Sequence, residues 1–141
     1  MDYNRRRGAL LRFWFRYIHR YTSLIEIGNL PALEQIMRNE YSTFSGISLE
    51  RWFRQKFMES HRYKTIGGWW QSGGVNAKGN KDEFEIDIVT QTLDGEVEAY
   101  EVKRNHQRYN PARLQEKVEM MQRHLFRGQE VKIGGLSLEE M

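Results

Sequence analysis

Hydrophobic and polar positions recur with a helical period over the first sixty residues. Residues 10–21 combine arginines spaced four apart with aromatic residues on the opposite face, which predicts an amphipathic helix. A second apolar stripe follows Pro31, a residue typical of the first turn of a helix. A third helix is predicted over 47–60, after a break at 42–46. The N-terminal part is therefore expected to be entirely helical.

The period changes after residue 62. Alternating and β-branched positions predict strands, a glycine-rich stretch at 71–80 predicts a loop, and Pro111 opens one more helical pattern. The predicted order is three helices, three strands, a helix and a strand, with no repeat and no long linker. The strands are expected at 63–70, 83–90, 97–103 and 130–133, and the last helix at 111–126.

Composition limits the possible classes. The chain has 141 residues, of which 39% are hydrophobic and 29% charged, as in an ordinary folded domain. It has no cysteine, which excludes disulfides, thiolate zinc sites and cysteine nucleophiles. The net charge of +3 permits a polyanionic partner without requiring one. Neither a transmembrane stretch nor a signal-peptide pattern is found, so a cytoplasmic protein without membrane contact is expected.

Acidic residues inside apolar strands are the first candidate chemistry. Asp87 is followed fourteen residues later by Glu101, and the turn between them contains Gly95. A two-residue turn would place the two carboxylates on opposite faces of the hairpin. A three-residue loop over 93–95 that ends in a left-handed glycine places them opposite each other. This second register is preferred because it gives the hairpin one apolar face and one charged face. The apolar face would consist of Ile86, Ile88, Tyr100 and Val102, and the charged face of Glu85, Asp87, Glu101 and Lys103.

Two like charges directly opposite each other destabilise a hairpin, and a bound divalent cation would offset that repulsion. Oxygen ligands favour Mg²⁺ or Mn²⁺. An exposed hairpin face with harmless mixed charges explains the pattern equally well. A third carboxylate, Glu50, lies in the first turn of the helix predicted at 47–60, where the helix dipole alone also favours an acidic residue. A second Glu-x-Lys, at 130–132, has no acidic partner on a predicted neighbouring strand.

The order of Glu50, Asp87 and Glu101-Val102-Lys103 on helix, strand and strand resembles the PD-(D/E)XK nuclease superfamily. The chain is further similar, over nearly its whole length, to the nuclease-like C-terminal domain of prokaryotic AAA-type (DEXX-box) ATPases. A Walker A pattern is missing. The chain is therefore expected to be a C-terminal fragment or a free-standing relative. The similar segments are residues 11–18, 23–29, 66–70, 85–89, 101–103 and 135–141.

The resemblance implies an α/β (α+β) fold of the restriction-endonuclease-like kind, with an αβββαβ core whose mixed central sheet is flanked by helices. Residues 45–141 would form this nuclease-like domain. Residues 1–44 would add two N-terminal helices packed on the core. The aromatic face of the first helix would cover the core, an ATPase domain or subunit, or a second copy in a homodimer.

The resemblance also implies roles. Asp87 and Glu101, with the Val102 carbonyl oxygen, would bind Mg²⁺ or Mn²⁺ for hydrolysis of DNA phosphodiester bonds. Lys103 would orient the attacking water or stabilise charge, and Glu50 would assist as a fourth catalytic residue. The alternative is a catalytically silent module that binds nucleic acid or protein for an ATPase partner. Glu85 is a possible auxiliary residue, and the phosphate contacts would be Lys78, Lys81, Arg104, Arg108 and Arg113.

Overall fold

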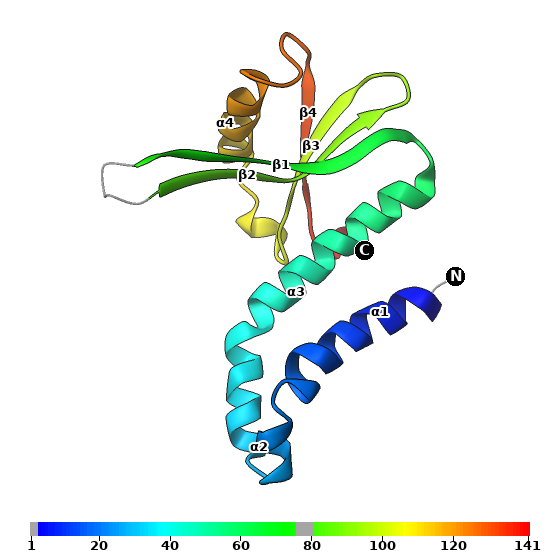
Figure 1. Ribbon diagram of the computed structural model, residues 1–141. Coiled ribbons are helices and arrows are strands. Elements are labelled where there is room, and N and C mark those ends of the chain that lie inside the picture. The colour runs from blue at the N-terminus through cyan, green and yellow to red at the C-terminus, as the bar shows by residue number, and fades with distance from the viewer. Residues whose placement is uncertain (1–2, 76–80) are drawn as a thin grey trace. The chain divides into compact units, whose positions relative to one another are not determined.

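The computed structural model describes the backbone of residues 3–75 and 81–141 and the side chains of residues 8–72 and 84–141. The chain divides into two compact units, Met1–Ser48 and Leu49–Met141. The elements in chain order (Figure 1) are α1 (Tyr3–Phe13), η1 (Trp14–His19), α2 (Thr22–Glu26), α3 (Leu30–Ser60), β1 (Tyr63–Val75), β2 (Lys81–Thr92), β3 (Val97–Val102), η2 (His106–Arg108), α4 (Pro111–Gln122), β4 (Val131–Leu136) and η3 (Leu138–Glu140).

Aromatic packing holds the first unit together. Tyr17 is buried, and its ring lies 5.2 Å from that of Phe13 and 5.6 Å from that of Phe44. Arg16 pairs with Glu40 across the same interface at 2.9 Å. The amphipathic helix predicted from the arginine spacing is therefore present. It changes to a wider π-helical turn over η1, a feature that shifts the face presented by the following residues.

The predicted break at 42–46 is wrong, because α3 runs without interruption from Leu30 to Ser60. The stretch contains Gly46 but no proline. A glycine inside a helix costs about 1 kcal/mol, which tertiary packing overrides easily. The division between the two units falls within this helix, after Ser48.

A four-stranded mixed sheet forms the second unit. The strand order is β1-β2-β3-β4, in which β1, β2 and β3 are antiparallel neighbours and β4 is parallel to β3. Each face of the sheet is covered by one helix, which gives three layers (Figure 1). The predicted order of three strands, a helix and a strand is confirmed, and the protein is an α+β structure.

Two hydrophobic cores lie on the two faces of this sheet. The core on the α4 side consists of Ile86, Val89, Val97, Ala99, Leu114, Val118 and Met121. The core on the α3 side consists of Leu49, Phe53, Ile88 and Val102. Of the two adjacent tryptophans in β1, Trp69 packs against the α4-side core and Trp70 is exposed. Successive side chains of a strand point to opposite faces of the sheet, so one of two adjacent tryptophans is expected to pack and the other to be exposed.

The β1–β2 hairpin is longer than predicted, because β1 continues to Val75 inside the stretch expected to be a loop, and β2 begins at Lys81, two residues before the predicted start. Its register shifts between Gly67↔Val89 and Trp69↔Ile86, so that β2 carries one extra residue opposite Gly68. This β-bulge changes the face on which the following side chains lie. Ile86 consequently joins the α4-side core while Ile88 joins the α3-side core, so the prediction that they share a face is wrong.

A buried carboxylate is hydrogen-bonded by hydroxyl groups within the sheet. Glu98 Oε2 accepts from Thr90 Oγ1 at 3.1 Å and from the Tyr100 hydroxyl at 3.0 Å. Burial, followed by the negative charge of Glu98, raises the pKa of Tyr100. The bond from Thr90 links β2 to β3, and both bonds satisfy a polar group that would otherwise be costly to bury.

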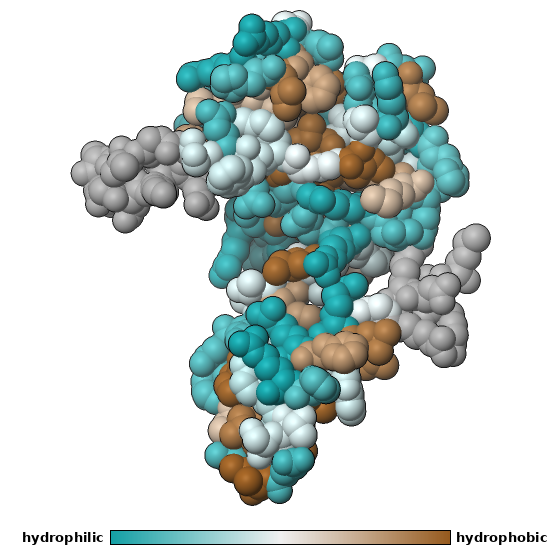
Figure 2. Space-filling model, in the orientation of Figure 1, coloured by the Kyte–Doolittle hydropathy of each residue, from teal (hydrophilic) through white to brown (hydrophobic). Residues whose placement is uncertain are grey.

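The surface of the second unit combines hydrophobic and hydrophilic side chains. On the face seen in Figure 2, its hydrophobic side chains form small separate areas among hydrophilic ones. Among the residues that the structure describes, no helix combines the length and the apolar composition that crossing a bilayer requires.

Candidate functional site

The β2–β3 hairpin brings the predicted acidic residues together. Its register runs from Gln91↔Val97 to Ile88↔Tyr100, which is the register of a three-residue loop. Gly95 has a φ of 91°, so the expected left-handed glycine is confirmed. Continued by one residue, this register places Asp87 opposite Glu101.

The Asp87 carboxylate contacts the backbone of strand β3. Its Oδ2 accepts a hydrogen bond from the backbone N–H of Val102 at 2.7 Å. The side chain thus takes the place of a backbone acceptor at the point where the two strands separate. A backbone amide fixes one carboxylate oxygen, while Oδ1 takes no part in this bond.

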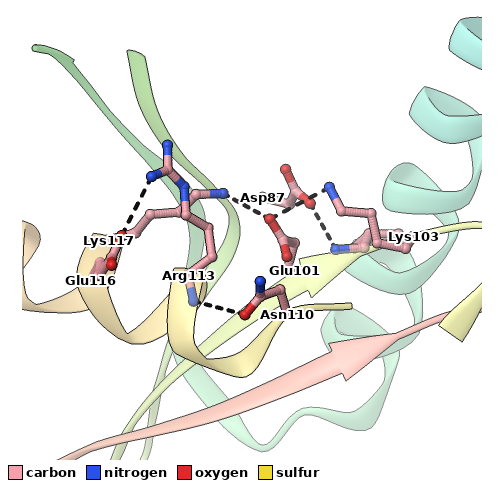
Figure 3. A network of polar contacts seen from close by, with 8 residues as sticks. Asp87, Glu101, Lys103, Asn110, Arg113, Glu116 and Lys117 are labelled. Atoms are coloured by element: carbon pink, nitrogen blue, oxygen red, sulfur yellow. Dashed lines mark hydrogen bonds and ion pairs between the residues drawn. The ribbon is translucent and has the colours of Figure 1, made fainter. Parts of the chain in front are cut away.

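Glu101 is buried and faces two lysines (Figure 3). Lys117 Nζ, from α4, lies 2.7 Å from Glu101 Oε1, and Lys103 Nζ lies 3.4 Å from the same oxygen. Only 5% of Glu101 is exposed, so it does not belong to a solvated face of mixed charges. Buried carboxylates are rarely left without a cation, and here the chain itself supplies two.

On the other side of the bulge, α3 contributes an arginine. Arg54 Nη2 donates to the Asp87 carbonyl oxygen at 2.5 Å and pairs with Glu50 Oε1 at 2.8 Å. Gly68 permits this approach, because a Cβ at that position would lie 2.8 Å from Arg54 Nη2. Glu50 is therefore connected to Asp87 through Arg54.

The pKa of Glu50 is raised by its surroundings. Burial is the main cause that raises its pKa, the negative charges of Asp87 and Glu85 add to the effect, and Arg54 opposes it. Strand alternation from Ile86 places Glu85 on the α3 side, in agreement with its influence on Glu50. Glu85 therefore lies on the side of the sheet opposite to Lys117, and the single acidic face expected from the sequence is divided by the bulge.

The site thus contains two carboxylates, Asp87 and Glu101, at one gap between strands. In the described part of the chain, no three acidic or histidine side chains gather closely enough to hold a metal ion. Two carboxylates beside a lysine can still share a cation with water or with a phosphate group, which is the usual environment of Mg²⁺.

The predicted phosphate contacts are only partly described. The side chains of Lys78 and Lys81 lie outside the described residues. Arg104, Arg108 and Arg113 are exposed, between β3 and the start of α4. Arg113 lies 3.4 Å from Glu116 and 5.7 Å from the centre of the Phe84 ring.

Three residues beside the site were not predicted from the sequence. Lys117 adjoins Val118 in the apolar stripe of α4, and Arg54 adjoins Phe53 in α3, so each is a cation at the border of a buried helical face. Tyr109 is the third, since burial and then the charge of Glu101 raise its pKa. The available signal was the position of each cation next to core residues, because long basic side chains there have to reach an internal partner or solvent.

A family model matches residues 14–131, so the chain belongs to DUF234, a family of archaeal and bacterial proteins of unknown function. No curated protein and no solved structure matches the chain.

Proposed function

We propose that this DUF234 protein is a divalent-cation-dependent nuclease domain that hydrolyses phosphodiester bonds of DNA. The observation that carries the proposal is the arrangement of Asp87, Glu101 and Lys103 at one gap between β2 and β3. An α3–β1–β2–β3–α4–β4 order with β4 parallel to β3 supports a PD-(D/E)XK-like assignment of the fold. That resemblance also suggests an AAA-type ATPase as a partner.

The donor set suits a hard cation. All of the acidic donors are oxygens, and the chain has no cysteine that would favour a softer metal. Mg²⁺ is usually held by one or two carboxylates and completes its coordination with water and substrate phosphate. Asp87 and Glu101, together with the Val102 carbonyl oxygen, are the residues proposed to hold it. A cation bound there would acidify a water molecule and offset the negative charge of the phosphate.

The remaining residues have roles that follow from their contacts. Lys103, which is partly exposed beside Glu101, would contact the phosphate oxygens as negative charge accumulates on them. Glu50 would act mainly through Arg54, whose guanidinium group binds the Asp87 carbonyl oxygen and so helps to orient the carboxylate. Arg104, Arg108 and Arg113 would bind the DNA backbone, whose affinity for basic residues depends strongly on salt.

A second function is favoured by one observation. Lys117 and Lys103 already neutralise Glu101 within the protein. A domain that binds DNA or a partner protein without cleaving it would need no cation beyond these. The two functions differ in whether Asp87 has a part in chemistry.

DNA cleavage distinguishes them. Purified protein is incubated with single-stranded, duplex and branched DNA in the presence of Mg²⁺, Mn²⁺ or EDTA. We expect cleavage that requires the cation and that Asp87→Ala abolishes. Asp94→Ala is the matched control, because Asp94 is an exposed acidic residue in the turn of the same hairpin and its replacement should leave cleavage unchanged. Cation-independent cleavage, equal cleavage by Asp87→Ala, or binding without any cleavage would contradict the nuclease proposal.

A further inference from the structure

Lys117 is an unusual lysine, because it is mostly buried. Only 14% of its side chain is exposed, and its Nζ lies 2.7 Å from Glu101 Oε1. Lysines are almost never this buried unless they are paired. The partner here is a carboxylate proposed to bind a divalent cation, so the lysine and the cation would require the same group.

The two lysines that face Glu101 are not equivalent. Lys103, which belongs to the Glu-x-Lys motif, lies 3.4 Å from Oε1 and is 37% exposed. Lys117 is nearer, more buried, and comes from a different element, α4. The main counter-charge of Glu101 is therefore Lys117 rather than the lysine of the motif.

We infer that Lys117 is the built-in counter-cation of Glu101, which holds the carboxylate when no divalent cation is bound and competes with that cation for it. This inference rests on the proposed function. An ammonium group and a divalent cation on one carboxylate repel each other strongly in a partly buried site. Cation binding would therefore move Lys117 away from Glu101.

A displaced Lys117 has a second consequence. Lys117 precedes the buried Val118 in α4, and its side chain is only 14% exposed, so a displaced ammonium group would stay near Glu101. A phosphate group that approached Asp87 and Glu101 would find this cation in addition to Lys103. Lys117 is thus a positioning residue that neutralises the empty site and contributes positive charge to the loaded one.

Calorimetric titration of the full chain with Mn²⁺ tests the inference without relying on activity. Lys117→Met removes the competing charge and keeps most of the apolar stem. It should bind Mn²⁺ about tenfold or more tightly than the wild type, a difference of about 1.4 kcal/mol, because no ammonium group would then repel the divalent cation. Circular dichroism verifies that the variant is folded. If it is not, Lys117→Gln retains a hydrogen-bond donor for Glu101 and carries the same expectation.

Lys132→Met is the matched control. Lys132 also lies close to a carboxylate, 2.9 Å from Glu96. Both of these side chains are exposed, and neither residue belongs to the proposed site. This substitution changes the net charge by the same amount, and Mn²⁺ affinity should not change. It separates competition for Glu101 from a general effect of lowering the positive charge of the protein.

The outcomes separate the inference from the proposed function. Equal or weaker Mn²⁺ binding by Lys117→Met, while the wild type binds, overturns the inference and leaves the proposed function intact. Binding by Lys117→Met alone supports the inference, because the lysine then masks the site. If no protein binds Mn²⁺, the proposed cation site is wrong and the inference fails with it.

Discussion

The contact between Arg54 and the bulge in β2 gives a sharp prediction for Gly68. A Cβ added at Gly68 would lie 2.8 Å from Arg54 Nη2 and 3.3 Å from the carbonyl oxygens of Asp87 and Ile86. The guanidinium group would have to move, although it is held at 2.5 Å by the Asp87 carbonyl oxygen and at 2.8 Å by Glu50. Gly68→Ala should therefore weaken both contacts.

The magnitude follows from the lost hydrogen bond. A bond that involves a charged group contributes about 1.5–3 kcal/mol, so the free energy of unfolding should fall by about 2 kcal/mol. Gly67→Ala is the control, because in the described part of the chain an added Cβ there meets nothing within 4 Å. Neither glycine has a positive φ, so the benefit of alanine in the unfolded chain is common to both variants.

Urea denaturation followed by circular dichroism measures the difference. With an m value of about 1–3 kcal/mol per molar urea, Gly68→Ala should unfold about 1 M urea earlier than Gly67→Ala. In an Arg54→Met background the added penalty of Gly68→Ala should shrink, because the obstructing group is gone. Equal midpoints for the two alanine variants would refute the role assigned to Arg54.

Three further predictions concern single residues. Glu50→Gln should stabilise the protein at neutral pH, because a raised pKa in the folded state means that the wild type loses stability as pH rises through that pKa. The difference from wild type, measured by urea denaturation, should vanish below pH 4. Tyr100→Phe should lower the free energy of unfolding by about 1–3 kcal/mol, since buried Glu98 loses a donor; an unchanged midpoint would contradict this. Trp69→Ala should cost about 2–3 kcal/mol and Trp70→Ala under about 0.5, because only Trp69 packs against a core, where it is partly buried. Similar melting temperatures for the two variants would argue against their assignment to opposite faces.

The β2–β3 hairpin could be predicted from the sequence because its determinants are local. Gly95 favours a left-handed conformation, and a three-residue loop then determines which residues of the two strands lie opposite each other. The pairing of Asp87 with Glu101 follows from that register. Helix positions could likewise be predicted where apolar stripes and Pro111 act within one element.

The features that could not be predicted from the sequence depend on contacts between distant segments. The bulge opposite Gly68 arises where β1 meets β2, and it reversed the expected face of Ile86. Alternation within one strand cannot reveal it. The partners of Glu101 and Asp87 depended similarly on α4 and α3, so Lys117 and Arg54 were indicated only by their positions at the border of apolar stripes. The continuity of α3 through Gly46 reflects packing that outweighs a small intrinsic penalty.

Anomalous diffraction from Mn²⁺-soaked crystals would show whether Asp87 and Glu101 share one divalent cation. We expect one Mn²⁺ peak about 2.1 Å from an oxygen of each carboxylate, with Lys117 Nζ moved away from Glu101. A soaked crystal in which Lys117 still pairs with Glu101, and in which Mn²⁺ binds only elsewhere, would contradict it.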